Sequence, residues 1–185
     1  MIGIDEVGRG CWAGPLLVVA ARLVGALPEG LADSKTLSHH QRESLLPDIR
    51  LACDIGEGWV QPEEIDESGL AAAMRTGVSR ALIALGATFD DEIIMDGNIN
   101  YCPIDFHASR AIIKADIQHG IVSAASVYAK VTRDKYMRQV ARFYPVYQFE
   151  KHVGYGTKLH QEMLEQYGVS AIHRRSYKPI QVLLS

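Results

Sequence analysis

Short apolar runs that lead directly into a carboxylate occur three times in this chain, and this pattern restricts the fold more than any other feature. Such runs, bounded by glycine or polar residues, are typical of strands in a buried sheet. Side chains at the ends of neighbouring strands can converge although they are far apart in the sequence. The pattern therefore predicts an α/β protein whose sheet gathers acidic groups at one edge. The predicted strands cover residues 2–7, 93–95 and 111–115, and the carboxylates at their ends are Asp5 with Glu6, Asp96 and Asp116.

A glycine-rich loop, 8–14, follows the first predicted strand and leads at Pro15 into a second strand, 16–24. A dinucleotide-binding loop needs a helix after its glycines, so this context disfavours that class of fold. From these residues alone, two interpretations stay open. Asp5 and Glu6 are either delivered by the strand to a functional site, or they form a surface acidic pair before an ordinary turn.

Apolar residues at helical spacing predict helices that cover the sheet. A capping box of Ser38 and Gln41 starts a helix that runs to about residue 51, and Pro62 starts another. No repeat or linker divides the 185 residues, so we expect one domain. Further helices are predicted over 69–85, 122–143 and 158–167, and a third strand over 53–60.

The composition excludes several classes of protein. Apolar residues make up 48% and charged residues 22% of the chain, and no apolar run approaches the length of a membrane span. The N-terminal residues lack the features of a secretory signal, so we expect a cytoplasmic protein with no membrane partner. The 3 cysteines are odd in number and widely spaced, which argues against a disulfide framework or a zinc site.

Charge is distributed unevenly along the chain, whose net charge is -3. Residues 1–110 carry 8 basic and 17 acidic side chains, whereas residues 111–185 carry 11 basic and 5 acidic ones. Such asymmetry hints at a polyanionic partner, although solvated helix faces explain it at least as well. The side chains expected to contact phosphates, if the partner is a nucleic acid, are Lys130, Arg133, Lys151 and Arg174.

Four carboxylates at one sheet edge would repel one another unless cations neutralise them. Mg²⁺ and Mn²⁺ prefer oxygen ligands, and two such ions about 3.5–4 Å apart can clamp the attacking and leaving oxygens of a phosphoryl transfer. The chain has no nucleophile elbow and no placed Cys–His pair, which disfavours covalent catalysis. One difficulty is that neighbours on a strand point to opposite faces, so Asp5 and Glu6 can share a site only if the strand ends or twists at Glu6.

Several short motifs occur in order over nearly the whole chain. They are Gly3-Ile4-Asp5-Glu6, Gly8-Arg9-Gly10, Ala13-Gly14-Pro15, Asp33-Ser34-Lys35, Asp96-Gly97, Lys114-x-Asp116, Ser123-Ala124-Ala125-Ser126, Ala129-Lys130-Val131-Thr132-Arg133-Asp134, Lys151-His152-x-Gly154-Tyr155-Gly156-Thr157 and His173-Arg174-x-Ser176. Together they resemble ribonuclease HII. The resemblance implies a ribonuclease H-like mixed β-sheet flanked by helices, in a single catalytic domain, 1–185, whose helical C-terminal part, about 145–185, binds substrate.

The same resemblance implies an activity. It implies a monomeric endonuclease that cleaves the RNA strand of RNA–DNA hybrids and also cuts on the 5′ side of a single ribonucleotide embedded in duplex DNA, leaving 3′-hydroxyl and 5′-phosphate ends. Its implied cofactors are two divalent metal ions, Mg²⁺ or Mn²⁺. Carried over by motif, the catalytic and metal-binding residues are Asp5, Glu6, Asp96 and Asp116.

The implied substrate contacts come from three further motifs. Gly8, Arg9 and Gly10 correspond to a loop that senses the ribose, and Tyr155 corresponds to a tyrosine that packs on the sugar beyond the junction. Cys11 and Trp12 depart from the family pattern, where proline and a smaller apolar residue are expected, so the shape of this loop is in question. The residues implied to contact backbone phosphate are Ser34 and Lys35.

Two rival functions remain from the sequence. A hybrid-binding module without enzymatic activity would explain the basic half, but it would not need four carboxylates that repel phosphate. Another two-metal nuclease of the same fold would use the same carboxylates, and the glycine loop and Tyr155 are the features that favour ribose recognition over it.

Overall fold

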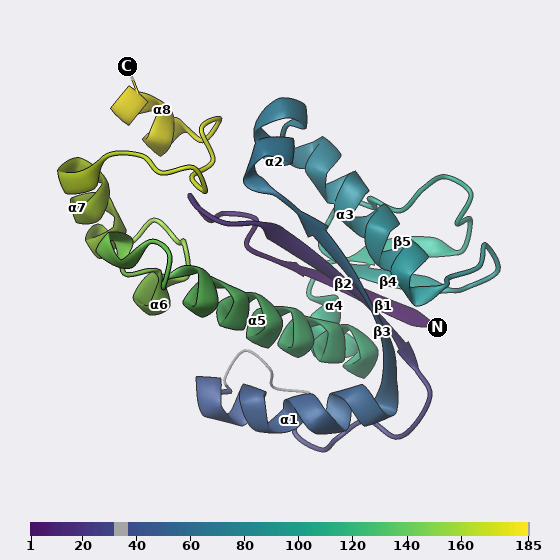
Figure 1. Cartoon of the computed structure of the whole chain (residues 1–185). Helices are drawn as coiled ribbons and strands as arrows, with labels where there is room; N and C mark the ends of the chain where they lie inside the picture. The colour runs from purple at the N-terminus through teal and green to yellow at the C-terminus, as the bar shows by residue number, and fades with distance from the viewer. Residues whose placement is uncertain (32–36, 185) are drawn as a thin grey trace.

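A five-stranded mixed β-sheet forms the centre of the molecule in the computed structural model, which describes residues 1–31 and 37–184 (Figure 1). The strand order is β3-β2-β1-β4-β5, with β1 antiparallel to β2, β2 antiparallel to β3, and the pairs β1/β4 and β4/β5 parallel. This arrangement confirms the predicted α/β class and its mixed sheet. The strands are β1 (Ile2–Val7), β2 (Leu16–Leu23), β3 (Cys53–Val60), β4 (Ile93–Asp96) and β5 (Ser109–Ile112).

Helices cover both faces of the sheet (Figure 1). On one face, apolar residues of β2 such as Leu17 and Val19 pack with α1 and α5, whereas on the other face Leu16 and Val18 pack with α2 and α3. This division follows the alternation of side chains along a strand. The helices are α1 (His39–Ala52), α2 (Pro62–Ser68), α3 (Leu70–Leu85), α4 (Ala115–Gln118), α5 (Gly120–Val140), α6 (Phe149–His152), α7 (Lys158–Tyr167) and α8 (Lys178–Leu184), with a 3-10 turn, η2, at Pro145–Tyr147.

The helix boundaries follow the expected local signals. Ser38 caps α1 and forms the predicted capping box with Gln41, and Pro62 is the first residue of α2. The long helix α5 ends at Val140, three residues earlier than the periodicity predicted, because residues 141–144 form turns before Pro145. None of the helices in the described ranges combines the length and the apolar character needed to cross a bilayer.

The prediction for the last strand was wrong. β5 covers Ser109–Ile112 instead of 111–115, so Asp116 does not lie at a strand end. Lys114 adopts a left-handed conformation with φ 60°, which turns the chain, and Asp116 lies in the first turn of α4. The apolar run 111–115 is shared between a strand end and a helix start, and periodicity cannot separate the two in so short a segment.

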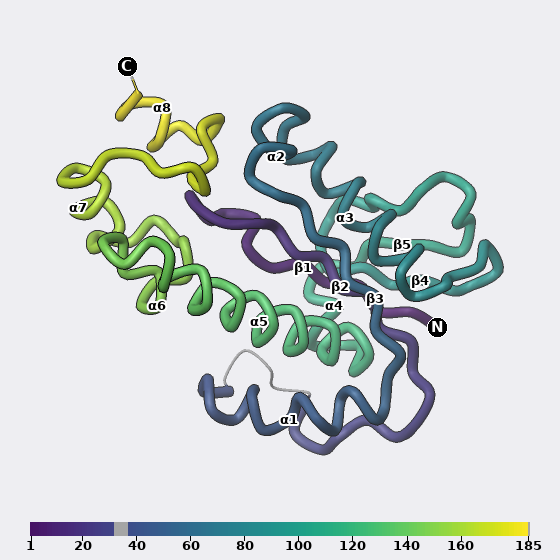
Figure 2. The backbone as a smooth tube through the Cα atoms, in the orientation of Figure 1, coloured from purple at the N-terminus to yellow at the C-terminus, as the bar shows by residue number. Residues whose placement is uncertain are grey.

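A separate helical part follows α5. Its apolar residues, Phe149, Leu164 and Ile180 among them, form a cluster of their own with Met137 of α5 and Ala13 of the β1–β2 connection. Ala13 also forms an isolated antiparallel bridge with His173. Figure 2 shows the tip of the β1–β2 hairpin beside the segment that precedes α8. The first and last motifs of the sequence are therefore neighbours in space.

Gly3 allows β1 and α5 to approach closely. A Cβ atom at this position would lie 2.6 Å from the backbone carbon of Ile121 and 2.7 Å from the nitrogen of Val122. Because both neighbours are backbone atoms, neither can rotate away, so helix and strand would have to separate.

We predict that Gly3→Ala lowers the free energy of unfolding by about 1–3 kcal/mol, the usual cost of overpacking. Urea or thermal unfolding measures the change. The matched control is Gly25→Ala, whose new Cβ would meet its nearest neighbour at 3.4 Å, an ordinary contact distance. Equal stability of the two variants would contradict the proposed contact.

Candidate active site

Asp5 lies in β1 on the face covered by α5 and is 8% exposed. The Ser126 side chain of α5 hydrogen-bonds to its carboxylate. Burial, together with the nearby negative charges of Glu6 and Asp96, raises the pKa of Asp5 to about 7. A buried carboxyl with this pKa is ordinary for a site that binds a cation or moves a proton, and unusual for a surface acidic pair.

Glu6 remains close to Asp5 although β1 does not end there. The strand covers Ile2–Val7, as predicted, so of the two conditions for a shared site the ending of the strand at Glu6 is not met. Instead, the Glu6 backbone N–H donates a 2.8 Å hydrogen bond to Asp5 Oδ1, and the Glu6 carboxylate lies 3.6 Å from Arg9 Nη1. Burial raises the pKa of Glu6, the charge of Arg9 lowers it and that of Asp96 raises it. The two acids interact electrostatically from opposite sides of one strand.

Asp96 reaches the same region from the neighbouring parallel strand. The register of β1 and β4 pairs Ile4 with Met95, which brings Asp96 next to Asp5. Its Oδ1 atom accepts a 2.7 Å hydrogen bond from the backbone N–H of Ala115. This bond ties the end of β4 to the first turn of α4, where Asp116 is buried with 2% exposure.

The donor set fits a hard divalent cation. It consists of carboxylate oxygens, which Mg²⁺ and Mn²⁺ prefer. Burial and the repulsion from Asp96 raise the pKa values of Asp5 and Glu6, and a bound cation would offset both effects. Within residues 1–31 and 37–184, no three His, Cys, Asp or Glu side chains already form a metal cage. Glu6 is directed to Arg9 and Asp96 to the N–H of Ala115, so their carboxylates do not converge fully.

The glycine loop, residues 8–15, is held tightly against α5. Gly8 has φ 87°, and a Cβ atom there would collide with the Arg133 side chain, so this position requires glycine. Gly10 is exposed, and a Cβ atom added there would have no neighbour within 4 Å. The tip of the loop is therefore open to solvent while its base is packed.

Two of the four side chains expected to contact phosphates lie inside the protein. Arg133 and Arg174 are both 0% exposed and donate hydrogen bonds to backbone carbonyls of the glycine loop. That part of the prediction is wrong, because a side chain in the core cannot reach a phosphate. Lys130 is partly exposed and pairs with Asp134 at 2.9 Å, and Lys151 is exposed.

Tyr155 lies beside the glycine loop and is 36% exposed. Its hydroxyl group interacts with the Cys11 thiol, and Lys130 Nζ lies 5.4 Å from the centre of its ring. Burial raises the pKa of Tyr155 to about 12, so the hydroxyl is neutral at physiological pH. The tyrosine presents an open ring at the surface and keeps its hydroxyl inside.

The unusual Cys11-Trp12 pair fits this arrangement. Trp12 donates its backbone N–H to the carbonyl of Gly154 at 2.8 Å, and its ring occupies the space where a side chain of Gly156 would lie. Cys11 is buried against the carbonyl of Val153. Both residues join the glycine loop to the Tyr155 segment.

Sequence reasoning missed a chain of buried histidines behind Tyr155. The Ser170 N–H donates to His173 Nδ1 at 3.0 Å, the two Nε2 atoms of His173 and His160 lie 3.0 Å apart, and His160 Nδ1 lies 3.0 Å from the Tyr155 carbonyl oxygen. Burial lowers the pKa of His160 to about 4 and that of His173 to about 3. Both rings are therefore neutral and serve to fix the Tyr155 backbone. His173 lies in one of the sequence motifs, whereas His160 lies in none of them, so a sequence signal existed for His173 alone.

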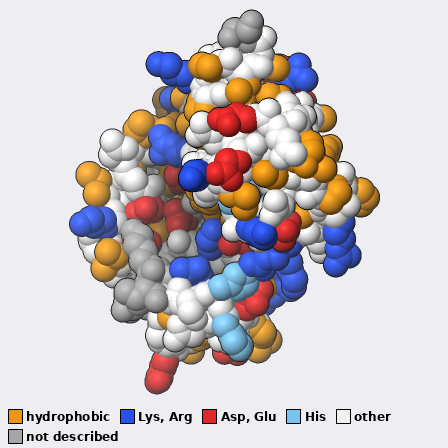
Figure 3. All heavy atoms as spheres, turned by 90° about the vertical axis from the view of Figure 1, so that its left-hand side faces the viewer, with side chains coloured by type: hydrophobic (Ala, Val, Ile, Leu, Met, Phe, Trp, Pro, Cys, Tyr) orange, Lys and Arg blue, Asp and Glu red, His pale blue; other side chains and the backbone are white. Residues whose placement is uncertain are grey.

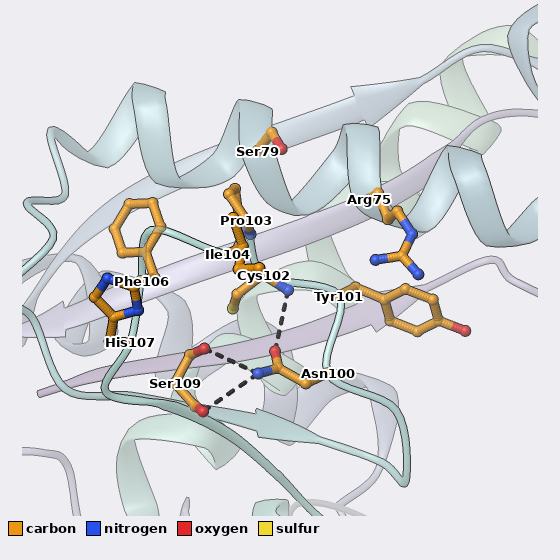
Figure 4. A pocket seen from close by; sticks show the side chains of 10 residues that line it. All are labelled: Arg75, Ser79, Asn100, Tyr101, Cys102, Pro103, Ile104, Phe106, His107 and Ser109. Atoms are coloured by element: carbon orange, nitrogen blue, oxygen red, sulfur yellow. Dashed lines mark hydrogen bonds between the residues drawn. The ribbon is translucent and has the colours of Figure 1, made fainter.

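Seen from the side of the glycine loop, acidic side chains gather in a hollow and basic side chains surround it (Figure 3). Ser34 and Lys35, expected at the phosphates, lie outside the described residues. A second hollow, of about 610 Å³, lies between α3 and the connection of β4 to β5 and contains Asn100, whose amide donates to Ser109 (Figure 4). None of the four carboxylates lines that hollow, so it is separate from the candidate site.

Comparison with known proteins agrees with this geometry. The family described as Ribonuclease HII matches residues 2–180. The chain belongs to the ribonuclease HII family. Relatives named ribonuclease HII from Marinomonas sp. strain MWYL1 and Vibrio parahaemolyticus are 43% and 42% identical, over 100% and 98% of this chain and 92% and 86% of theirs. The chain is therefore an endoribonuclease of the class that acts on RNA–DNA hybrids.

Solved structures show the same fold. Ribonuclease HII of Archaeoglobus fulgidus, determined in complex with PCNA, is 24% identical with a TM-score of 0.81 over 100% of this chain and 96% of that one. Bst-RNase HIII, determined with Mn²⁺, is 20% identical with a TM-score of 0.71 over 99% of this chain and 68% of that one. The ribonuclease HII architecture is thus retained at low sequence identity.

The pKa of Asp5 predicts a pH dependence of stability in EDTA. Because the folded-state pKa, about 7, lies above the ordinary value of 3.8, stability falls as pH rises from about 4 to about 7 and is constant above that range. We predict that Asp5→Asn removes this fall and stabilises the protein at pH 8 by roughly 2–4 kcal/mol, with no difference below pH 4. Urea unfolding across this pH range measures it.

The matched control is Asp105→Asn, which changes an exposed carboxylate in the connection of β4 to β5. Its stability should follow the parent at every pH. Parallel curves for the parent and Asp5→Asn would show that Asp5 ionises normally.

Proposed function

We propose that this enzyme, besides cleaving RNA in RNA–DNA hybrids, cuts on the 5′ side of a single ribonucleotide in duplex DNA and leaves 3′-hydroxyl and 5′-phosphate ends. Three features that lie close together carry the proposal. They are the buried or half-buried carboxylates of β1, β4 and α4, the open tip of the glycine loop, and the exposed ring of Tyr155. Carboxylates alone would serve any nuclease of this fold. The loop and the tyrosine provide a means to recognise a ribose.

Asp5, Glu6, Asp96 and Asp116 are proposed to hold two divalent ions, Mg²⁺ or Mn²⁺. When bound, these ions supply positive charge to the attacking and leaving oxygens of the phosphodiester. The oxygen-only donor set, the raised pKa of Asp5 and the Mn²⁺ complex of a protein with this fold support the assignment. Asp96 accepts the Ala115 N–H at Oδ1, which leaves Oδ2 for a cation.

Recognition of the ribose is assigned to the glycine loop. At its exposed tip, the backbone of Arg9 and Gly10 can meet a 2′-hydroxyl, the group that distinguishes RNA from DNA. The absence of a side chain at Gly10 lets the main chain approach the sugar edge. The Tyr155 ring then packs on the neighbouring sugar, with Lys130 beside it for the backbone phosphate.

The test of this proposal is incubation with a duplex that carries one ribonucleotide, with and without Mg²⁺, beside an all-DNA duplex of the same sequence. The proposal predicts a single Mg²⁺-dependent cut at the ribonucleotide and an intact all-DNA duplex. Cleavage of hybrids without cleavage at the single ribonucleotide would contradict it. A cytoplasmic location and a monomeric state stay predictions from the sequence.

We predict that Asp116→Asn folds normally but loses roughly 100-fold or more of the Mg²⁺-dependent rate, because a neutral amide of equal size binds a cation less well. Circular dichroism checks the fold, and single-turnover cleavage measures the rate. Asp105→Asn, exposed in the connection before β5, serves as the control and should keep the parental rate. Near-parental turnover by folded Asp116→Asn would remove Asp116 from the site.

We predict that Tyr155→Ala loses most cleavage at a single ribonucleotide, by roughly 5-fold to 100-fold, as expected for the loss of one aromatic packing contact. Divalent-ion affinity, measured by calorimetry, should change little. Tyr155→Phe should keep more activity than Tyr155→Ala because it retains the ring. Tyr167→Ala alters another exposed tyrosine, in α7, and should keep the parental rate. If Tyr155→Ala cleaves at the single ribonucleotide as fast as the parent, the role proposed for Tyr155 is wrong.

A further inference from the structure

We propose that Arg133, Arg174 and Tyr177 are positioning residues for ribose recognition: Arg133 fixes the glycine loop relative to the Tyr155 segment, and Arg174 and Tyr177 hold the Arg9 carbonyl inward, so that the N–H of Gly10 faces the substrate. This inference rests on the proposed function of the loop, and it goes beyond that function by assigning its selectivity to side chains that do not touch the substrate.

Arg133 joins three segments from within the core. Its Nε donates to the Pro15 carbonyl at 2.8 Å and its Nη2 to the Ala13 carbonyl at 3.2 Å, both in the glycine loop. Its Nη1 donates to the Val153 carbonyl at 2.9 Å, two residues before Tyr155. One guanidinium group of α5 thereby fixes the glycine loop relative to the Tyr155 segment.

Arg174 and Tyr177 hold the other side of the loop. Arg174 donates to the Gly14 carbonyl from Nε at 3.0 Å and from Nη2 at 2.9 Å. Its Nη1 donates to the Arg9 carbonyl at 3.1 Å and to the Tyr177 hydroxyl at 2.8 Å, and that hydroxyl donates to the same Arg9 carbonyl at 2.6 Å. The Arg9 carbonyl thus accepts two hydrogen bonds from the C-terminal part.

The two buried arginines bind carbonyl groups, which is unusual because buried cations are usually paired with carboxylates. In the described ranges, neither Arg133 nor Arg174 forms an ion pair with a carboxylate, although both are fully buried. A buried charge without such a partner is costly unless every N–H finds an acceptor. Here the acceptors are loop carbonyls, and the planar guanidinium can reach several of them at once, which a lysine cannot.

Peptide geometry connects these bonds to the substrate side. In a planar trans peptide, the C=O group and the following N–H group point in opposite directions. Because Arg174 and Tyr177 hold the Arg9 carbonyl inward, the N–H of Gly10 must point outward. In residues 1–31 and 37–184, the backbone N–H groups of Arg9 and Gly10 donate to no protein acceptor, whereas those of Cys11 and Trp12 are satisfied within the protein.

The experiment compares Tyr177→Phe, which removes a single hydroxyl, with the parent. Binding is measured by fluorescence anisotropy in EDTA, with one duplex that contains a single ribonucleotide and one that is all DNA. We expect Tyr177→Phe to lower the ratio of the two affinities by roughly threefold to tenfold, the effect of about one hydrogen bond, with unchanged affinity for the all-DNA duplex. In cleavage assays with Mg²⁺, kcat/KM at the single ribonucleotide should fall to a similar extent.

Tyr147→Phe is the matched control. It removes a tyrosine hydroxyl that donates to the Gly168 carbonyl at 2.9 Å, a comparable bond in the same C-terminal part but away from the glycine loop. It should lower thermal stability and leave the affinity ratio at the parental value. Arg174→Lys should reduce the ratio more than Tyr177→Phe, and if this variant fails to fold, Tyr177→Phe still decides the question.

A parental affinity ratio in folded Tyr177→Phe, with a loss of thermal stability alone, would overturn the inference and leave the proposed function intact. A parent that does not cut at the ribonucleotide, or does not distinguish the two duplexes, would overturn the proposed function and this inference together.

Discussion

The close packing of α5 on β1 is the constraint on which the rest of the site depends. Gly3 permits the backbones to approach, and the helix then reaches the site through Ser126, Lys130 and Arg133. These residues are four and three positions apart, so they lie on one face of the helix. The first contacts a carboxylate, the second lies over the Tyr155 ring, and the third holds the glycine loop. A single rigid element therefore sets the distances between three parts of the site that belong to different segments of the chain.

Acidic and basic side chains occupy different parts of the candidate site, which the net charge of the protein does not show. The acidic groups lie at the sheet, where burial raises the pKa values of Asp5 and Glu6, and the buried arginines lie behind the glycine loop, bound to carbonyls. Neither set neutralises the other within the described ranges. The acidic set is the one proposed to bind cations, whereas the two buried arginines donate hydrogen bonds to carbonyls of the glycine loop.

The sequence predicted the parts of this structure that depend on local pattern. Strands β1, β2 and β3 and helix α5 were evident from apolar spacing, and the capping box at Ser38 located the start of α1. The position of Asp116 in a helix was not evident from the sequence. The chain turns at Lys114 in a left-handed backbone conformation, which is uncommon for lysine and is therefore not indicated by the residue type. The burial of Arg133 and Arg174 was also missed, since arginine is usually exposed and its carbonyl partners lie far away in the sequence. The histidine chain behind Tyr155 depends on tertiary contacts in the same way.

The pairing of the first and last motifs has a consequence for synthesis. Gly14 and Arg174, which are joined by hydrogen bonds, are 160 residues apart. Chains emerge from the ribosome N-terminus first, so β1, with Asp5 and Glu6, is available long before the segment that secures the neighbouring loop. A nascent chain can therefore form the β1–β2 hairpin before the hydrogen bonds from Arg174 to Gly14 exist. The glycine loop is held in its final position only after the region around Arg174 has emerged and packed against the hairpin.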